Sequence, residues 1–228
     1  MNDPHLETLI RIMPPQRGAG DEVDWDAVQA RWGTRLPADY HAFMAVYGGG
    51  TIGGELSVLL PLPVDDYPQW NPGSIADETP TLRHLWEADG GVPGTGLGAE
   101  AVLAWGIGSS NPDLLGWLMT GSDPDQWPVV VWRRHVAWGT PNLALFDYGM
   151  AAFLTRLLLA EFDQCPLSDV GLWGRVQPFV HWREQQRRFL AGLDPLTGQP
   201  DPYAGMAPPV IDTNPEPAAP AYPSNHDG

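Results

Sequence analysis

Over its first fifty positions the chain repeats apolar residues at steps of three and four, the period of a helix that packs on one side. Three helices are predicted there. The first is short and ends before the two prolines at 14–15, and the second begins after Asp24, a good N-cap, and ends at Gly33. The third opens at Pro37. Its apolar stripe is the most regular of the three and consists of Leu36, Tyr40, Phe43, Met44 and Tyr47.

Beyond the glycines at 48–50 the period shortens to that of strands. Apolar segments separated by turn residues predict strands at 56–60, 102–107, 114–119 and 129–133, with an edge strand at 143–146. Three more helices are expected. The first covers residues 81–89, the second runs from a cap at Asp147 through Phe162, and the third covers residues 179–190. Helices, then an antiparallel meander, then helices again predict an α+β layer domain.

The last part of the chain differs from the rest in composition. Of the 35 residues from 194 to 228, nine are proline and none is lysine or arginine. Such a segment buries too little apolar surface to offset the entropy of ordering it. We therefore expect one α+β domain over residues 1–193, and a flexible, proline-rich and acidic tail over residues 194–228.

Charge narrows the classes of partner. The 228 residues include 28 acidic and 12 basic side chains, a formal charge of -16, and every basic residue is arginine. This balance argues against direct contact with nucleic acid or an anionic membrane. No apolar run approaches the roughly 18 residues that span a bilayer, and the first residues lack a basic, apolar leader. We expect a cytoplasmic protein.

No motif indicates catalysis, a metal or a cofactor. The glycine-rich residues 48–53 formally match a dinucleotide fingerprint, but they follow a helix and precede a strand, so no helix N-terminus faces a pyrophosphate. The six histidines are scattered, and the lone Cys165 precedes a proline. A glycosidase-type pair among carboxylates such as Asp123 and Asp125 stays open, although their spacing around Pro124 is typical of a turn. The chain is expected not to be an enzyme.

Eleven tryptophans are the most unusual component. Five of them fall on predicted helix stripes or strands and are expected in the core: Trp25, Trp32, Trp105, Trp117 and Trp132. Trp70 and Trp127 lie in loops beside acidic residues, where they either anchor a partner or cap the core from outside. The three arginines at 183, 187 and 188 either pair with the acidic body or contact a partner. The candidate partner-binding residues are Asp65, Asp66, Trp70, Asp77, Asp113, Asp123, Asp125 and Trp127.

Three groups of residues carry a family resemblance. They are Trp32-Gly33, Leu36-Pro37, Asp39-Tyr40, Phe43, Tyr47 to Gly50 and Ile52; Trp105-Gly106, Asn111 to Asp113, Leu115 and Trp117; and Asp123 to Asp125 with Trp127 to Val130. In this order they resemble the SUKH superfamily, which includes the yeast cell-wall-synthesis regulator and many bacterial toxin-immunity proteins. The resemblance covers about residues 25–162. It implies an α+β fold with a central, mostly antiparallel sheet flanked by helices. It also implies a non-enzymatic binding role, typically the neutralisation of a toxin inside the producing cell, and it carries over no binding residue.

Charge and resemblance lead to the same hypothesis. A toxin that cuts nucleic acid tends to have a basic cleft, and an acidic inhibitor can occupy that cleft in place of phosphates. We therefore expect an immunity-type protein whose partner is a basic toxin domain. The alternatives are a regulatory scaffold in cell-envelope or stress signalling that uses the tail at 194–228, and an unrecognised enzyme.

Overall fold

The computed structural model describes residues 3–64 and 72–204. The helices are α1 (Pro4–Ile12), α2 (Trp25–Trp32), α3 (Ala38–Val46), α4 (Ile75–Ala88), α5 (Met150–Leu158) and α6 (Trp182–Leu190), with short 3-10 helices η1 (Ala99–Ala101) and η2 (Pro124–Gln126). The strands are β1 (Gly50–Ile52), β2 (Leu56–Val58), β3 (Val102–Gly108), β4 (Leu114–Leu118), β5 (Val129–Trp132), β6 (Leu143–Phe146) and β7 (Phe179–His181).

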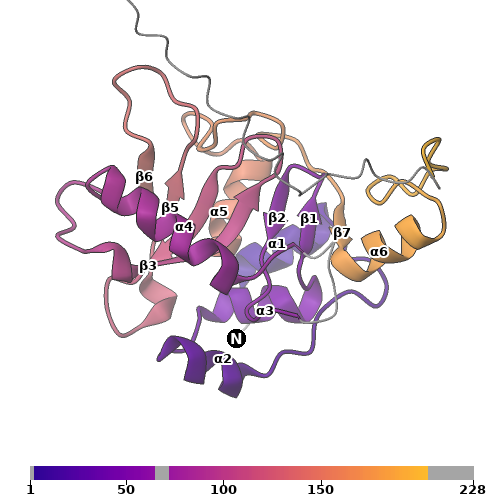
Figure 1. The fold of residues 1–228 in the computed structure, drawn as a ribbon, viewed down its shortest axis with the longest axis horizontal. Coiled ribbons are helices and arrows are strands. Elements are labelled where there is room, and N and C mark those ends of the chain that lie inside the picture. The colour runs from indigo at the N-terminus through magenta and orange to yellow at the C-terminus, as the bar shows by residue number, and fades with distance from the viewer. Residues whose placement is uncertain (1–2, 65–71, 205–228) are drawn as a thin grey trace, which may run out of the picture.

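Within the described residues these strands form one sheet in the order β6-β5-β4-β3-β2-β1-β7, and every neighbouring pair is antiparallel (Figure 1). The predicted α+β class and the edge position of β6 are confirmed. Two strands that the sequence pattern did not reveal are β1 and β7. They pair with each other in the register Gly50↔His181, so a segment near the C-terminal end of the described chain completes the sheet.

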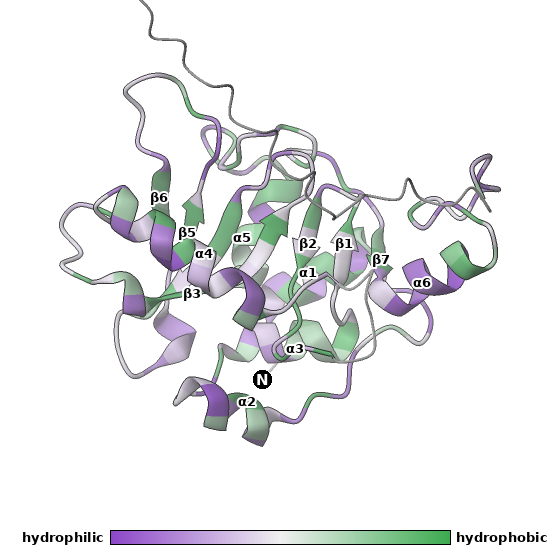
Figure 2. Cartoon of the chain, in the orientation of Figure 1, coloured by the Kyte–Doolittle hydropathy of each residue, from purple (hydrophilic) through white to green (hydrophobic). Residues whose placement is uncertain are grey.

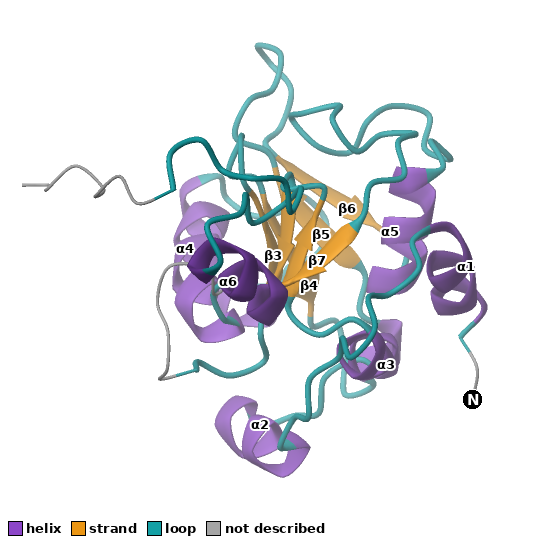
Figure 3. Ribbon diagram, turned by 90° about the vertical axis from the view of Figure 1, so that its right-hand side faces the viewer, coloured by secondary structure: helices purple, strands orange, loops and turns teal. Residues whose placement is uncertain are grey.

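Helices cover both faces of the sheet (Figure 3). On one face α4 packs mainly on β3. On the other face α1, α3 and α5 pack against one another. The described chain is therefore a helix–sheet–helix sandwich, and the hydropathy of its strands matches their position in the middle layer (Figure 2).

The core between the sheet and α5 is aromatic. Trp105 and Trp117 are fully buried, and they meet Phe153 and Tyr40 in edge contacts with ring centroids 6.2 and 5.2 Å apart. The hydroxyl of Tyr40 donates a 2.7 Å hydrogen bond to the carbonyl of Leu59, which satisfies both groups in an apolar interior. The predicted stripe of α3 is confirmed, because its five residues have no measurable exposure.

Three of the tryptophans expected in the core are only half-buried. Trp25 stacks on His41 with ring centroids 3.5 Å apart, and Trp132 donates a 2.9 Å hydrogen bond from its indole nitrogen to the carboxylate of Asp89. Trp32 packs against the outside of the core in the same way. The indole nitrogen of Trp132 thus finds a polar partner, whereas that of Trp32 is shielded from solvent and makes no hydrogen bond within the described residues.

Several helix boundaries differ from prediction for identifiable reasons. Helix α4 begins at Ile75 rather than at 81, because Ser74 and Asp77 form a capping box upstream, and the helix continues through Pro80. Helix α5 begins after Gly149 and ends at Leu158, so Asp147 is not its cap and Phe162 lies beyond it. Helix α6 starts at Trp182 because the three residues before it belong to β7.

The glycines that end α3 also allow β7 to come close. A Cβ on Gly48, whose φ is +69°, would lie 2.5 Å from both Asp21 Oδ2 and His181 Nε2. A Cβ on Gly50 would overlap the carbonyl oxygen of Val180. These glycines therefore stop the helix and leave room for the last strand.

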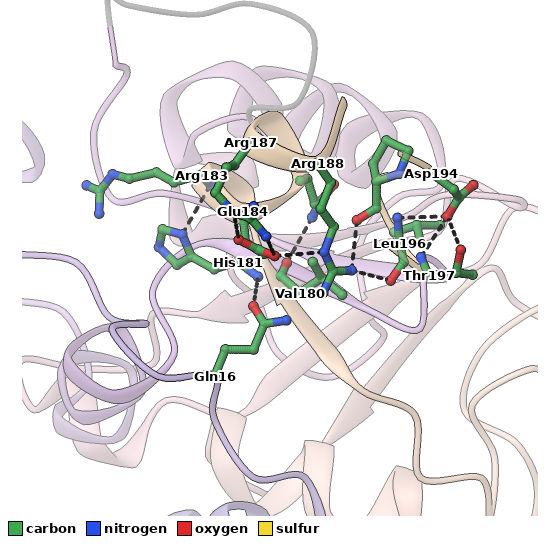
Figure 4. A network of polar contacts seen from close by, with 12 residues as sticks. Gln16, Val180, His181, Arg183, Glu184, Arg187, Arg188, Asp194, Leu196 and Thr197 are labelled. Carbon is green, nitrogen blue, oxygen red and sulfur yellow. Dashed lines mark hydrogen bonds and ion pairs between the residues drawn. The ribbon is translucent and has the colours of Figure 1, made fainter. Parts of the chain in front are cut away.

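The beginning of the predicted tail is hydrogen-bonded to α6. Asp194 accepts bonds from the main-chain nitrogens of Leu196 and Thr197, and Arg188 donates to the carbonyl oxygen of Leu196 at 2.6 Å (Figure 4). The segment predicted as flexible thus starts with a turn that folds back on α6. Flexibility beyond residue 204 stays a prediction, because residues 205–228 lie outside the described part.

Candidate protein-interaction groove

The predicted partner-binding residues fall into different environments. Asp65, Asp66 and Trp70 lie outside the described residues. Asp113 and Trp127 are interior residues, with 2% and 3% exposure. Asp77, Asp123 and Asp125 are exposed.

Asp113 and Trp127 take structural positions rather than the surface positions expected of them. The carboxylate of Asp113 accepts hydrogen bonds from the main-chain nitrogens of Arg134 and Ser168, at 2.8 and 2.6 Å. The indole nitrogen of Trp127 donates to the carbonyl of Gly121 at 2.8 Å. The expectation of an exposed anchor fails for Trp127 because the ring folds under its own loop. The alternative that it caps the core is the one realised.

Asp77 is separated from the other exposed acids. It lies in the first turn of α4, where it accepts bonds from the nitrogen and hydroxyl of Ser74 at 2.8 and 2.7 Å. Helix α4 covers the face of the sheet opposite to α1, α3 and α5 (Figure 3). Asp77 therefore does not share a surface with the carboxylates described next.

Asp123 and Asp125 are brought together by Arg35. Nη2 of Arg35 lies 2.9 Å from Asp123 Oδ1 and 3.0 Å from Asp125 Oδ2, and Nη1 lies 3.1 Å from Asp125 Oδ1. Asp125 Oδ1 also accepts a 2.7 Å bond from the main-chain nitrogen of Ala38, the first residue of α3. These bonds, that from Arg35 above all, hold the pKa of Asp125 below its usual value.

Asp125 stands at the edge of a groove of about 470 Å³ where three helices begin. The N-terminal residues of α1, α3 and α5 line it, together with the loop that carries η2. Its acidic residues are Asp3, Asp39 and Asp125, and its walls include Pro4, Pro37 and Trp127. The groove therefore combines carboxylates with rigid apolar surfaces.

Each of these carboxylates caps a helix. Asp3 accepts bonds from the main-chain nitrogens of His5 and Leu6 at 2.7 and 3.2 Å. Asp39 reaches across to α5, where its Oδ2 accepts a 2.9 Å bond from the nitrogen of Ala151. The charges thus complement the positive ends of the three helix dipoles, and the hydrogen bonds hold these acidic side chains in place at the groove.

Asp39 carries the least compensated of these charges. Its Oδ1 is shielded from solvent and makes no hydrogen bond of standard geometry within the described residues. Burial raises the pKa of Asp39, and the charges of Asp3 and Asp125 raise it further, against the effect of the bond from Ala151. Asp39 belongs to the first turn of α3, where a carboxylate also favours the dipole of its own helix. Its role at α5 depends on a contact 112 positions away.

A second polar cluster surrounds the start of α6 (Figure 4). Arg183 lies 2.8 Å from Asp21, and Arg187 and Arg188 lie 2.6 and 2.8 Å from Glu184, whose pKa falls to about 2 mainly because of the bond from Arg187. These arginines therefore pair within the chain, as one of the two alternatives expected. Beneath them His181 Nε2 lies 3.3 Å from Asp21 Oδ1, and both side chains are 5% exposed.

Other kinds of site are not seen in the described part of the chain. Residues 3–64 and 72–204 contain no group of three or more histidine, cysteine or carboxylate side chains placed to hold a metal ion. In the same ranges no helix has the length and apolar character needed to cross a bilayer. The groove is the feature of these residues that best fits a functional surface.

Comparison with known proteins gives one match. A family model described as SMI1 / KNR4 family (SUKH-1) matches residues 20–140. No curated protein and no solved structure matches the chain. The matched residues include α2 to α4, strands β1 to β5 and the loop of Asp123 and Asp125.

Proposed function

The chain belongs to the SMI1/KNR4 family (SUKH-1), and from this membership we propose that it is a non-enzymatic protein-binding module of the immunity type, which neutralises a partner toxin by direct binding. Members of this superfamily include immunity-like and regulator-like proteins. The groove at the N-termini of α1, α3 and α5 is the surface that supports the first of these roles.

The observation that carries the proposal is the fixed set of carboxylates in this groove. Asp3 and Asp39 are held by main-chain bonds, and Asp125 is held by both Ala38 and Arg35. A partner that inserts a lysine or arginine side chain would meet these charges already in place, so little side-chain entropy is lost on binding. The partner's basic side chain would also offset the charge of Asp39, which water does not reach at Oδ1.

The charge of the whole chain suits rapid capture of a basic toxin. With a formal charge of -16, encounter with a positively charged domain is accelerated, to on the order of 10⁸ M⁻¹s⁻¹ at low salt. An inhibitor that acts on a toxin arriving in the cell benefits from this rate. The partner is accordingly a protein with a basic cleft, and contact with nucleic acid or membrane is not part of the proposal.

The wider contact surface stays a proposal. Asp123 lies beside Asp125 and extends the acidic edge of the groove. Asp65, Asp66 and Trp70 are retained as candidate contacts on their sequence alone. Asp77 is retained as a test of whether the surface reaches α4.

Co-expression with the product of the adjacent gene tests the proposal. The neighbouring protein should be toxic alone and harmless when this chain is present. The double variant Asp3→Asn with Asp125→Asn removes two charges but keeps acceptor oxygens for the helix caps, and it should weaken the rescue. Glu87→Gln, an exposed charge on α4, is the matched control and should rescue fully. If no adjacent protein is toxic, the immunity role is rejected.

A regulatory scaffold would give a different result. Such a protein would use the proline-rich C-terminal residues, and deletion of 205–228 would abolish its interactions while leaving the turn bonded to α6 intact. A toxin inhibitor that uses the groove should bind equally well after this deletion.

A further inference from the structure

Trp138 stands apart from every other tryptophan in the described residues. Its side chain is fully exposed, with a relative accessibility of 103%. It lies in the loop between β5 and β6, residues 133–142, which projects from the end of the sheet (Figure 1). A single exposed apolar side chain is ordinary on a protein surface, and Trp138 is distinguished instead by the ordered loop that presents it and by the basic residues beside it.

A tight turn fixes this exposure. The nitrogen of Thr140 donates to the carbonyl of Ala137 at 2.9 Å, which places Trp138 and Gly139 at the two central positions of a turn. Gly139 has φ +82°, the conformation that favours glycine at the second central position. Trp138 therefore occupies the first central position, and its side chain points away from the turn.

The base of the loop is also fixed. Arg133 and Asn142 face each other there: the main-chain nitrogen of Arg133 donates to the carbonyl of Asn142 at 2.9 Å, and the side-chain nitrogen of Asn142 donates to the carbonyl of Arg133 at 2.7 Å. Buried Asp113 holds the nitrogen of Arg134, and Ser168 Oγ accepts from the nitrogen of His135 at 3.0 Å. The loop is thus ordered before any partner arrives, which lowers the entropy lost on binding.

The charge of the loop is opposite to that of the protein. Residues 133–142 include Arg133, Arg134 and His135 and no acidic residue, whereas the whole chain carries -16. Arg133 is occupied by carbonyl groups of its own loop. The exposed guanidinium of Arg134 makes no ion pair within the described residues.

We propose that the β5–β6 loop is a protein-docking element, in which Trp138 inserts into an apolar pocket of a partner protein and Arg134 meets a carboxylate at the edge of that pocket. Tryptophan and arginine are the residues most enriched among those that dominate binding energy at protein interfaces. The element lies at the opposite end of β5 from η2 and the acidic groove, because β5 runs from Val129 beside η2 to Trp132 beside the loop. The loop and the groove therefore recognise opposite chemistry at separate places.

A protein fits this loop better than a membrane or a nucleic acid does. Anionic lipids and phosphates would attract two or three cations of the loop but repel the remaining acidic surface. A pocket on a protein contacts only the loop. Carboxylates at the edge of that pocket would pair with Arg134 and would lie away from the acidic surface of the rest of the chain.

The experiment places a photo-crosslinking phenylalanine derivative at position 138 of the full chain, in the cells that produce it. The same derivative at position 190 is the control, because Leu190 is another highly exposed apolar side chain, at 76%, on α6. Position 138 should yield one discrete cross-linked protein that position 190 does not. That protein, purified, should bind the wild-type chain. Trp138→Ala should weaken this binding by about 30-fold, Trp138→Phe by less, and Leu190→Ala should not change it.

Several results would overturn the proposal: equal cross-linking at 138 and 190, cross-links only to lipid or to a second copy of the chain, or a purified partner whose affinity is the same for wild type and Trp138→Ala. None of these bears on the groove. The rescue of cells from an adjacent toxin is measured separately, so the two proposals can fail independently.

Discussion

The carboxylate of Asp125 lies 2.7 Å from the main-chain nitrogen of Ala38, 87 positions earlier in the chain. A helix usually takes its cap from the residue just before it, but Pro37 precedes α3 and provides no side-chain bond. The loop before β5 supplies the cap instead. The same arrangement recurs at α5. Gly149 precedes this helix and has no side chain to cap it, and Asp39 supplies the cap from α3. Two of the segments that carry the family resemblance therefore meet at the N-terminus of α3.

Removal of the Asp125 cap should destabilise the fold in a graded way. Asp125→Ala loses both the bond to Ala38 and the pair with Arg35, and we expect the free energy of unfolding to fall by about 1 to 2 kcal/mol. Asp125→Asn keeps an acceptor for Ala38, so the expected loss is less than about 1 kcal/mol. Asp123→Asn, which removes the exposed pair with Arg35 but keeps an acceptor for the nitrogen of Asp125, is the control. Urea unfolding, monitored by tryptophan fluorescence, measures these differences. If the alanine and asparagine variants at 125 were equally stable, the hydrogen bond to Ala38 would not contribute to the stability of the fold.

The buried carboxylate of Asp21 should make stability depend on acid pH. Burial opposes its ionisation, but the interactions with His181, the nitrogen of Gly49 and Arg183 outweigh burial and lower the pKa of Asp21 below the usual 3.8. A group with a lowered pKa in the folded state adds stability above its unfolded pKa, and this stability is lost as the pH falls through the folded value. Asp21→Asn should therefore be less stable than wild type at pH 6, by about 2 kcal/mol.

The difference between Asp21→Asn and wild type should shrink as the pH falls below about 4. Denaturant unfolding at a series of pH values from 6 to 3 measures it. Glu22→Gln, an exposed neighbour, should follow the wild-type curve throughout. A constant gap between Asp21→Asn and wild type over this range would show that the charge of Asp21 is not what stabilises the site.

Gly48 should not tolerate a side chain. Alanine at this position meets both an unfavourable φ of +69° and the polar atoms of Asp21 and His181 at 2.5 Å. We expect Gly48→Ala to lower the free energy of unfolding by about 2 to 3 kcal/mol. Gly90→Ala is the matched control, because its φ of +74° is similar but its Cβ would meet no atom within 4 Å. Hydrogen exchange should show loosening of β7 and α6 only for Gly48→Ala.

Binding to a basic partner should depend on the groove and on salt. The association rate should fall as salt rises from 50 to 500 mM, because the interaction is between opposite charges. Asp3→Asn and Asp125→Asn should each slow association several-fold. Asp77→Asn distinguishes two surfaces: it leaves the rate unchanged if the groove alone binds, and it slows binding if the acidic surface extends to α4. Stopped-flow or surface-based kinetics with the toxin supplies the rates.

The sequence predicted elements that depend on local pattern. The stripe of α3 and the segments of β3, β4 and β5 are regular and apolar, and they form where expected. Strands β1 and β7 were missed because each has only three residues. β1 forms between β2 and β7, and β7 pairs with β1 from a distant part of the chain, which no local pattern shows. Helix α4 begins at Ile75 rather than at 81, because the capping box at Ser74 determines its start and the helix continues through Pro80.

The site was less predictable than the fold. The roles of Asp39 and Asp125 as caps rest on contacts across 112 and 87 positions, and composition indicated only that acidic residues are abundant. Asp113 was predicted as a surface contact because it lies in a turn, but three hydrogen bonds hold it inside. Exposed Trp138 could have been noticed from the Trp-Gly pair in a loop, which is a turn signal with an aromatic residue at its tip.

The pairing of β1 with β7 also sets the order in which a nascent chain can fold. Strand β1 leaves the ribosome about 130 residues before its outer neighbour, since Gly50 pairs with His181. During that interval synthesis can complete the meander, but one edge of the sheet keeps unpaired peptide groups that could join another growing chain. Premature termination before β7 would leave that edge open permanently, so incomplete translation products should be prone to aggregation.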